Sequence, residues 1–234
     1  MKKYLLFAIC LFGCSLHAFA KGSYTDYVDP FIGTATVGHT YPGATLPFAM
    51  VQVSPDTGTQ GWEYCAGYHD ADSSIIGFSH THLSGTGCPD MGDILLMPIT
   101  GEPCFEAGSK ENPDSGYRSR FDHANETARP GYYSVRLDDY DIFAEMTVIL
   151  DLGHGIGDET MQSSIRQIDD RTLVGVRHSA GFVKDHQYYF CIRFSRPIEE
   201  IVSYCDGTVG EKTEIAGKIC KMYAGFGEAE SKPL

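Results

Sequence analysis

The chain has 234 residues, of which 42% are hydrophobic and 12% aromatic, and its formal net charge at pH 7 is −13. An acidic chain of this kind repels phosphate backbones, which excludes nucleic acid as a partner. No apolar run after the first residues is long enough for a transmembrane helix. The length suits one large domain with a buried core.

The first twenty residues are typical of a secretory signal peptide. Two lysines precede a short apolar segment, and Ala18-Phe19-Ala20 forms an A-x-A cleavage signal. We therefore expect residues 1–20 to be removed, which leaves one domain, residues 21–234, in the periplasm or at the cell surface. Cys14 offers an alternative as a lipid anchor, because Leu11-Phe12-Gly13-Cys14 resembles a lipoprotein site, although the bulky Phe12 fits that pattern poorly.

Six cysteines lie outside residues 1–20. Their spacing contains no C-x-x-C pair and does not resemble a small disulfide-stapled scaffold. We expect mostly buried thiols that pack as small hydrophobic groups. An exported protein can form disulfides, so one or two bridges stay open as an alternative. The six are Cys65, Cys88, Cys104, Cys191, Cys205 and Cys220.

Residues 24–60 are punctuated by glycine and proline, which predicts ordered loops followed by a strand at Leu46–Val53. The next segment, Gly61–His69, places the only tryptophan, Trp62, beside Glu63, two tyrosines and a histidine. An aromatic face flanked by hydrogen-bonding groups suits a sugar ring, whose C–H face is apolar and whose edge is polar. Trp62 and Glu63 are therefore candidate substrate-binding residues. The alternative for Trp62 is an anchor in the hydrophobic core.

The stretch from Gly77 to Pro98 is the part around which we organise the chain. His80 and His82 stand two positions apart, and such residues share a face of an extended segment, so both should point the same way. Ser84-Gly85-Thr86-Gly87 follows, and its glycines permit positive φ angles and close backbone approach. Polar groups beside a compact loop can present donors to a small polar ligand. This makes His80, His82, Gly85 and Thr86 further candidate substrate-binding residues.

Two alternatives compete for the histidine pair. Imidazoles can merely satisfy neighbouring backbone groups. A zinc site is the sharper alternative, since histidine is a common zinc ligand, but further ligands would have to come from elsewhere and no H-E-x-x-H pattern occurs. We assign no metal ligand in this chain.

The remaining chain reads as short strands separated by turns. After Asp90 and Asp93, the apolar run Ile94–Met97 predicts a buried strand ended by Pro98. Residues 102–130 are rich in turn-forming and charged residues, which predicts a long surface loop. No long amphipathic helix pattern occurs, so the many short strands predict an all-β sandwich. The later predicted strands are Tyr132–Leu137, Ile142–Leu150, Ser163–Ile168, Thr172–Ser179, Gln187–Phe194, Ile198–Tyr204 and Lys218–Tyr223.

Several strings together resemble the N-terminal domain of glycoside hydrolase family 92, a family of exported bacterial α-mannosidases. They are VDPFIGT, GHTYPGA, PFAMVQVSPDT, CAGYHDAD and GFSHTHLSGTG-x-x-D-x-GDILLMP, in this order from about Tyr27 onward. The resemblance implies a large β-sandwich, or supersandwich, that packs in the family against a C-terminal (α/α)6 barrel. It also implies enzymes that depend on calcium and invert the anomeric centre.

The sequence departs from the family pattern in two places that matter. About one strand is missing between Thr147 and Val148, which we expect to leave an unpaired sheet edge. The chain also stops at Leu234, where the family continues into the barrel.

The resemblance places the catalytic acid, the catalytic base and the calcium ligands in the barrel. We therefore assign no catalytic residue, expect no cofactor within this chain, and expect no hydrolysis by the chain alone. The resemblance implies a glycan-binding portion of an α-mannosidase that acts on mannose-containing glycans, with the barrel supplied in cis or in trans. The alternatives are a stand-alone carbohydrate-binding module and a non-functional remnant of a truncated gene.

Overall fold

Residues 23–45, 49–85, 87–138 and 147–227 are described by a computed structural model. These ranges contain no α-helix, which confirms the predicted all-β class, and their short 3-10 helices are η2 Tyr24–Tyr27, η3 Trp62–Tyr64 and η4 Pro113–Ser115. The strands are β1 Ser54–Asp56, β2 Ser74–Ile75, β3 Gly77–Ser79, β4 Leu95–Ile99, β5 Ser119–Arg129, β6 Tyr132–Leu137, β7 Thr147–Asp151, β8 Glu159–Asp169, β9 Thr172–Ala180, β10 His186–Arg193, β11 Glu200–Cys205, β12 Thr208–Gly210, β13 Glu214–Gly217 and β14 Cys220–Gly225.

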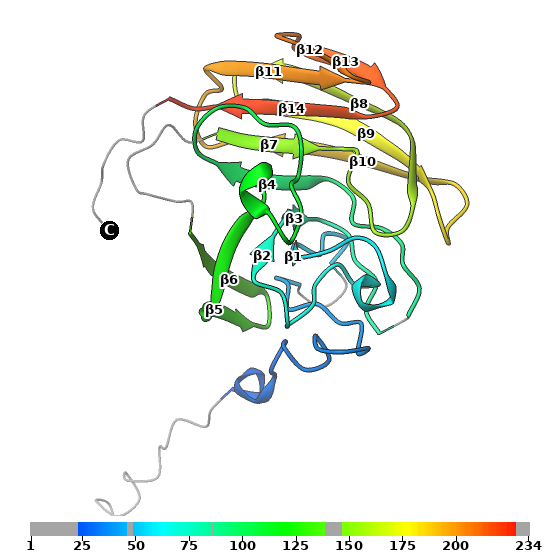
Figure 1. Cartoon of the computed structure of the whole chain (residues 1–234). Helices are drawn as coiled ribbons and strands as arrows, with labels where there is room; N and C mark the ends of the chain where they lie inside the picture. The colour runs from blue at the N-terminus through cyan, green and yellow to red at the C-terminus, as the bar shows by residue number, and fades with distance from the viewer. Residues whose placement is uncertain (1–22, 46–48, 86, 139–146, 228–234) are drawn as a thin grey trace, which may run out of the picture.

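The strands form three antiparallel sheets (Figure 1). The largest has the order β1-β3-β4-β7-β14-β11-β12, the second β10-β9-β8-β13 and the third β2-β5-β6. In the largest sheet, β14 is inserted between β7 and β11, so the sheet joins segments that are far apart in the sequence.

Alternate residues of the central strands fill two separate cores. In β7, Ile149 packs toward Phe121 and the three-stranded sheet, whereas Leu150 packs toward Ile165 and the four-stranded sheet. Successive side chains of a strand point to opposite faces, so the seven-stranded sheet is covered on both sides. This explains why the predicted buried run, Ile94–Met97, is apolar at every position.

Pro98 does not end the strand that contains this run, so that prediction is wrong. β4 continues to Ile99, and Pro98 pairs with Val148 of β7. On the other side of β4, the register joins β3 only at Leu96. Proline is tolerated there because no ladder hydrogen bond from its nitrogen is needed on that side.

Two other strand predictions are also wrong. Ser119–Arg129 is a strand rather than part of a loop, and most of its residues are exposed, which gives it a loop-like composition. In the predicted strand Leu46–Val53, the described residues contain only an isolated bridge from Val53 to Ala44, and β1 begins at Ser54. Glycine and proline in this region favour loops over a continuous ladder.

The expected unpaired edge near Thr147 is wrong as well. Thr147 is paired with Ile99 of β4 on one side and with Gly225 of β14 on the other. The strand that follows the departure from the family pattern is therefore central in the sheet.

The cysteines differ from the prediction of mostly buried thiols. Cys65 and Cys220 are buried, Cys191 is exposed and the other three are partly exposed. Strand position explains the exposed thiol, because Cys191 lies on the outward face of β10, which alternates between half-buried and exposed residues. None of the helices in the described part of the chain has the length and apolar character needed to cross a membrane.

Candidate functional site

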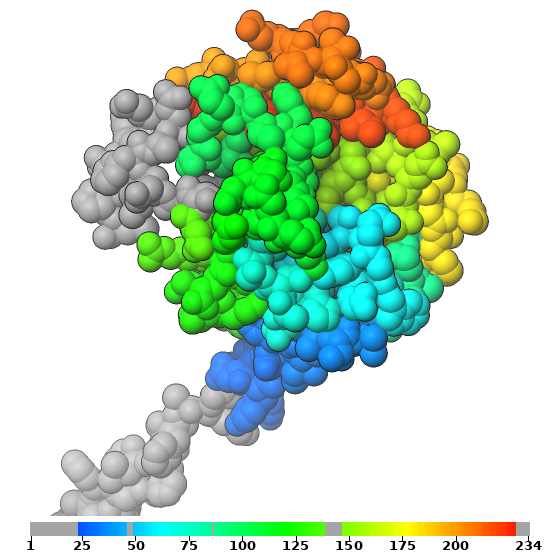
Figure 2. All heavy atoms as spheres, in the orientation of Figure 1, coloured from blue at the N-terminus to red at the C-terminus, as the bar shows by residue number. Residues whose placement is uncertain are grey.

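Trp62 lies on the surface and is not a core anchor. Its side chain belongs to the short helix η3, and the residue is 57% exposed. In Figure 2, residues 23–45 (dark blue) lie on the surface beside the segment around residues 50–75 (cyan). Exposing an indole to water sacrifices apolar burial, so a side chain in this position is suited to a ligand or partner.

His39 holds the Trp62 ring from the side. The two rings meet edge to face, with centroids 4.9 Å apart and an interplanar angle of 82°. His39 is only 7% exposed, and its Nε2 has no hydrogen-bond partner among the described residues. A buried polar atom without a partner costs free energy, so a ligand hydroxyl that reached this nitrogen would recover it.

The predicted glycine loop lies against the same two rings. The Gly85 backbone N–H donates to the His39 carbonyl oxygen. A Cβ added at Gly87, where φ is +63°, would lie 3.0 Å from Cη2 of Trp62 and 3.3 Å from Nδ1 of His39. The loop can approach so closely only because this residue is glycine. Thr86 lies outside the described residues, and Glu63 is exposed beside Trp62.

His82, in contrast, is buried in the interior. Its Nε2 lies 2.8 Å from Oδ1 of Asp56, and its Nδ1 lies 2.8 Å from the carbonyl oxygen of Gln52. His154 contacts the other carboxylate oxygen, with its Nε2 2.7 Å from Oδ2 of Asp56. The ring of Tyr41 packs on His82 at a centroid distance of 4.8 Å.

In this His82–Asp56–His154 network, the two histidines stabilise the negative charge of the buried Asp56 carboxylate. Burial alone would raise the pKa of Asp56, but the charges and hydrogen bonds of His82 and His154 hold it well below its usual range. The carboxylate is therefore ionised and accepts hydrogen bonds from both rings. Gly67 makes room for it, since a Cβ there would lie 2.1 Å from Oδ1 of Asp56.

His80 and His82 do not act as a pair on one face. β3 ends at Ser79, so the two histidines follow the strand rather than belong to it. His80 is half-buried, and its Nδ1 lies 2.6 Å from the carbonyl oxygen of Ile94. Burial lowers the pKa of His80, although the hydrogen bond to Ile94 opposes that effect. Nδ1 of each ring thus faces a backbone carbonyl oxygen, whereas Nε2 of His82 faces the side chains of Asp56 and Ser79.

Asp90 and Asp93 tie the motif to the opposite sheet. Oδ2 of Asp90 accepts the backbone N–H of Val183 at 2.7 Å. Oδ1 of Asp93 accepts from Nη1 of Arg177 at 2.6 Å, and Asp158 binds the same guanidinium. Asp90 and Asp93 thus both make contacts that hold the fold together.

The ring nitrogens of His82 leave nothing for a metal ion. Both are occupied by protein groups, Nδ1 by the carbonyl oxygen of Gln52 and Nε2 by the carboxylate of Asp56 and the hydroxyl of Ser79. In the described ranges, no three His, Cys, Asp or Glu side chains are grouped so that they could hold a metal ion. The chain therefore offers no described set of residues for zinc or calcium.

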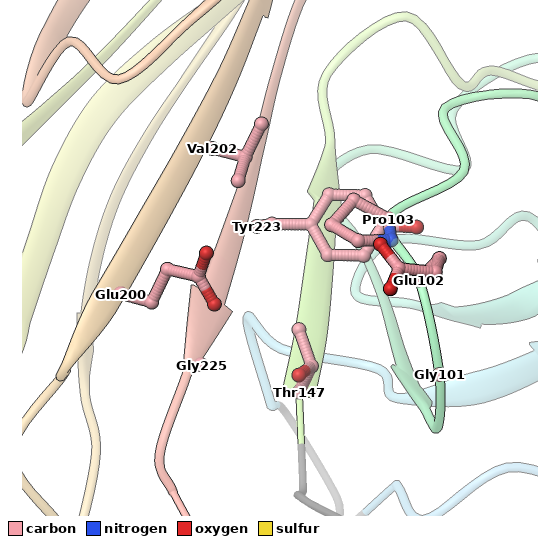
Figure 3. A pocket seen from close by; sticks show the side chains of 8 residues that line it. All are labelled: Gly101, Glu102, Pro103, Thr147, Glu200, Val202, Tyr223 and Gly225. Carbon is pink, nitrogen blue, oxygen red and sulfur yellow. The ribbon is translucent and has the colours of Figure 1, made fainter.

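A hollow of about 390 Å³ lies elsewhere, above the end of β14 (Figure 3). Glu102 and Glu200 approach it from opposite sides, and Tyr223 forms its wall. None of the predicted site residues that the structure describes lines it. Its described lining contains these two acidic side chains and no lysine, arginine or histidine.

The structure therefore divides the predicted residues into two groups. Trp62, Glu63 and Gly85 lie on one surface, which we call the Trp62 surface and which also includes His39 and Gly87. His82 lies in the interior, and His80 is half-buried. Sequence analysis missed His39, although its position in Gly38-His39-Thr40 beside a glycine was a signal, and its φ of 54° is unusual for a residue with a side chain.

Comparisons with known proteins place these features in a family. The model for the glycosyl hydrolase family 92 N-terminal domain matches residues 27–149 and 147–234. The two matched pieces meet in β7, where the sequence analysis expects about one strand to be missing. An uncharacterized secreted glycosidase of Arthroderma benhamiae is 38% identical over 130 residues, which is 55% of this chain and 16% of that protein.

Solved structures of family GH92 mannosidases resemble this chain in the same way. A family GH92 alpha-mannosidase from Bacteroides thetaiotaomicron, in complex with mannoimidazole, has a TM-score of 0.82 and 34% identity over 87% of this chain. A family GH92 inverting mannosidase from the same organism has a TM-score of 0.68 and 26% identity over 88% of this chain. This chain spans 30% of the length of each of them. The fold and the matched segments together show that the chain belongs to glycosyl hydrolase family 92, of which it carries the N-terminal domain.

Proposed function

We propose that this chain is the glycan-binding, N-terminal portion of an exported α-mannosidase that acts on mannose-containing glycans. The observation that carries the proposal is the exposed ring of Trp62 beside the buried Nε2 of His39, which has no hydrogen-bond partner among the described residues. A flat apolar face next to an unused hydrogen-bonding atom matches a pyranose, which has an apolar C–H face and a hydroxyl-lined edge. A solved relative that is 34% identical to this chain is an alpha-mannosidase in complex with mannoimidazole, which supports mannose as the sugar.

The rest of the site would come from a second domain. One exposed surface buries only part of a sugar, whereas glycosidase pockets enclose the substrate. We propose that a C-terminal barrel domain, in cis or in trans, covers the Trp62 surface and supplies the acid, the base and the calcium ligands of the complete enzyme. The relatives' greater length supports this, because this chain covers only 30% of the solved mannosidases.

Replacing Trp62 with alanine is expected to weaken binding of an α-linked mannobiose about tenfold, since sugar–aromatic contact contributes roughly 1–1.5 kcal/mol. Trp62 is exposed, so the melting temperature should stay close to that of the wild type. Isothermal titration calorimetry on the chain without residues 1–20 measures the affinity. The emission of Trp62, the only tryptophan, provides a second readout in the wild type.

Tyr189→Ala is the matched control, because Tyr189 is a 71% exposed aromatic residue on β10 of another sheet. The affinity of the Tyr189→Ala variant for the mannobiose should equal that of the wild type. Equal losses in the two variants, or tryptophan emission that does not respond to the sugar, would contradict the proposal. Tight binding by this chain alone would favour the stand-alone module over a half-site.

We expect this chain alone not to hydrolyse mannosides. An inverting glycosidase needs a carboxylic acid and a carboxylate about 6.5–9.5 Å apart on opposite sides of the scissile bond. The most buried acids, Asp56 and Asp93, are already paired with histidines or Arg177. Incubation with α-1,2-linked mannobiose and calcium tests this, with an authentic α-mannosidase as positive control. Turnover that persists through purification and disappears on an Asp or Glu substitution would show that this domain holds the catalytic pair.

We also propose that the protein is exported. The signal peptide predicted for residues 1–20, with cleavage before Lys21 or lipid attached to Cys14, lies outside the described residues. The relative that is described as secreted supports export. Mass spectrometry of the mature N-terminus distinguishes the two processing routes.

A further inference from the structure

We infer that Cys205 and Cys220 form an intramolecular disulfide when the chain meets a disulfide oxidant. The two residues are direct partners in the antiparallel pairing of β11 with β14. Their sulfur atoms lie 3.5 Å apart. Closing a bond requires an approach of about 1.5 Å, since a disulfide is about 2.05 Å long.

The register places this pair at the type of position where a bridge fits. Asp206 donates its backbone N–H to the carbonyl of Ile219, and the N–H of Ile219 returns a hydrogen bond to Oδ1 of Asp206, so those two residues occupy a hydrogen-bonded position of the ladder. Antiparallel pairs alternate, which makes Cys205 and Cys220 a non-hydrogen-bonded pair. Such pairs have Cα atoms about 4.5 Å apart, inside the range that disulfides span.

The backbone on the far side of Cys220 agrees with this assignment. Its carbonyl oxygen accepts from the backbone N–H of Leu152 in the direction of β7, at 3.1 Å. Its own N–H donates to the hydroxyl of Ser163 at 3.0 Å. The backbone N–H and carbonyl of Cys220 thus point away from β11, so forming the bond disturbs no ladder hydrogen bond between the two strands.

The exposure of the two thiols to solvent determines which one reacts with the oxidant first. Cys205 is partly exposed, whereas Cys220 is fully buried, so an external oxidant reaches Cys205 first. The Cys205 thiolate attacks a disulfide of the oxidant, forms a mixed disulfide and releases one thiol. The Cys220 thiolate then attacks the sulfur of Cys205 and releases the second thiol. Two protein thiols lose two hydrogens, and the oxidant's disulfide is reduced to two thiols.

The bridge would stabilise a junction between the two sheets. The cysteines are 15 positions apart, and the segment between them contains β12 of the seven-stranded sheet and β13 of the four-stranded sheet. A cross-link closes this loop in the unfolded chain as well and reduces its entropy. For a loop of this length in a domain of this size, we expect the melting temperature to rise by roughly 5–10 °C.

Peptide mapping after treatment with oxidised glutathione tests the inference. Trypsin should release residues 194–212 linked to residues 219–221, and reduction should separate them. Recovery of the two peptides as alkylated thiols, as stable glutathione adducts, or linked to other cysteines would overturn the inference. The map depends on bonds rather than on stability, so it remains informative if a variant folds poorly.

Three variants complete the test. Cys205→Ser and Cys220→Ser should each lose the linked peptide and the rise in melting temperature on oxidation. Cys191→Ser is the matched control, because Cys191 is exposed on β10. This substitution should leave both the linked peptide and the rise in melting temperature unchanged. A rise in melting temperature that persists in Cys205→Ser would assign the effect to another pair.

Discussion

Arg177→Leu is expected to destabilise the folded chain by about 3–5 kcal/mol, the usual cost of removing one partner from a buried ion pair. Arg177 is 1% exposed on β9, and its guanidinium lies 2.6 Å from Asp93 and 2.8 Å from Asp158. Its Nε also donates to Thr160 at 3.1 Å. Leucine would leave two buried carboxylates without a cation. A domain stable by about 5–15 kcal/mol would lose a large part of that margin.

Urea unfolding followed by circular dichroism measures the effect. Lys218→Leu is the control, because Lys218 pairs with Glu159 at the surface, where an ion pair contributes little. The control should leave the unfolding midpoint almost unchanged. Equal midpoints for the two variants would show that the Arg177 cluster does not hold the sheets together.

Asp56→Asn is expected to cost about 2–4 kcal/mol near neutral pH, because it removes the buried anion that faces His82 and His154. The cost should depend on pH in a defined direction. The folded-state pKa of Asp56 lies below its ordinary value of 3.8, so its contribution is fully present above that value. It is lost as the pH falls toward the folded-state pKa.

The stability difference between wild type and Asp56→Asn should therefore be larger at about pH 6 than at about pH 3. Urea unfolding at both values measures it. Asp114→Asn is the matched control, since Asp114 is exposed and pairs with Arg120 at the surface. A difference that stays constant from pH 6 to pH 3 would contradict the ionised state of Asp56.

Much of the fold was predictable because strand signals are local. The segment Tyr132–Leu137 coincides with β6, and Leu95–Met97 of the predicted apolar run lie in β4. β5 was missed because its outward residues are polar, and no local signal shows that Ser119–Arg129 pairs with β6. Sequence shows which residues can form a strand, but burial and pairing depend on distant segments.

The site was predictable in part, for the same reason. Trp62, Glu63 and Gly85 come from motifs whose chemistry is visible in short strings. His82 was predicted as a substrate-binding residue because spacing in an extended chain shows that residues share a face, but it does not show which face is inside. Its interior position depends on Asp56, and the third member of the network, His154, is 98 positions away from Asp56.

The insertion of β14 between β7 and β11 has a consequence for the timing of folding. The chain leaves the ribosome from its N-terminus, so β1, β3, β4 and β7 emerge well before Gly225. Until then, the strands on the two sides of β14 have no neighbour to join them into one sheet. Pairings between segments this far apart form slowly. For a chain exported as we propose, late completion of the sheet favours passage through the secretion channel in an extended state, with folding on the far side of the membrane.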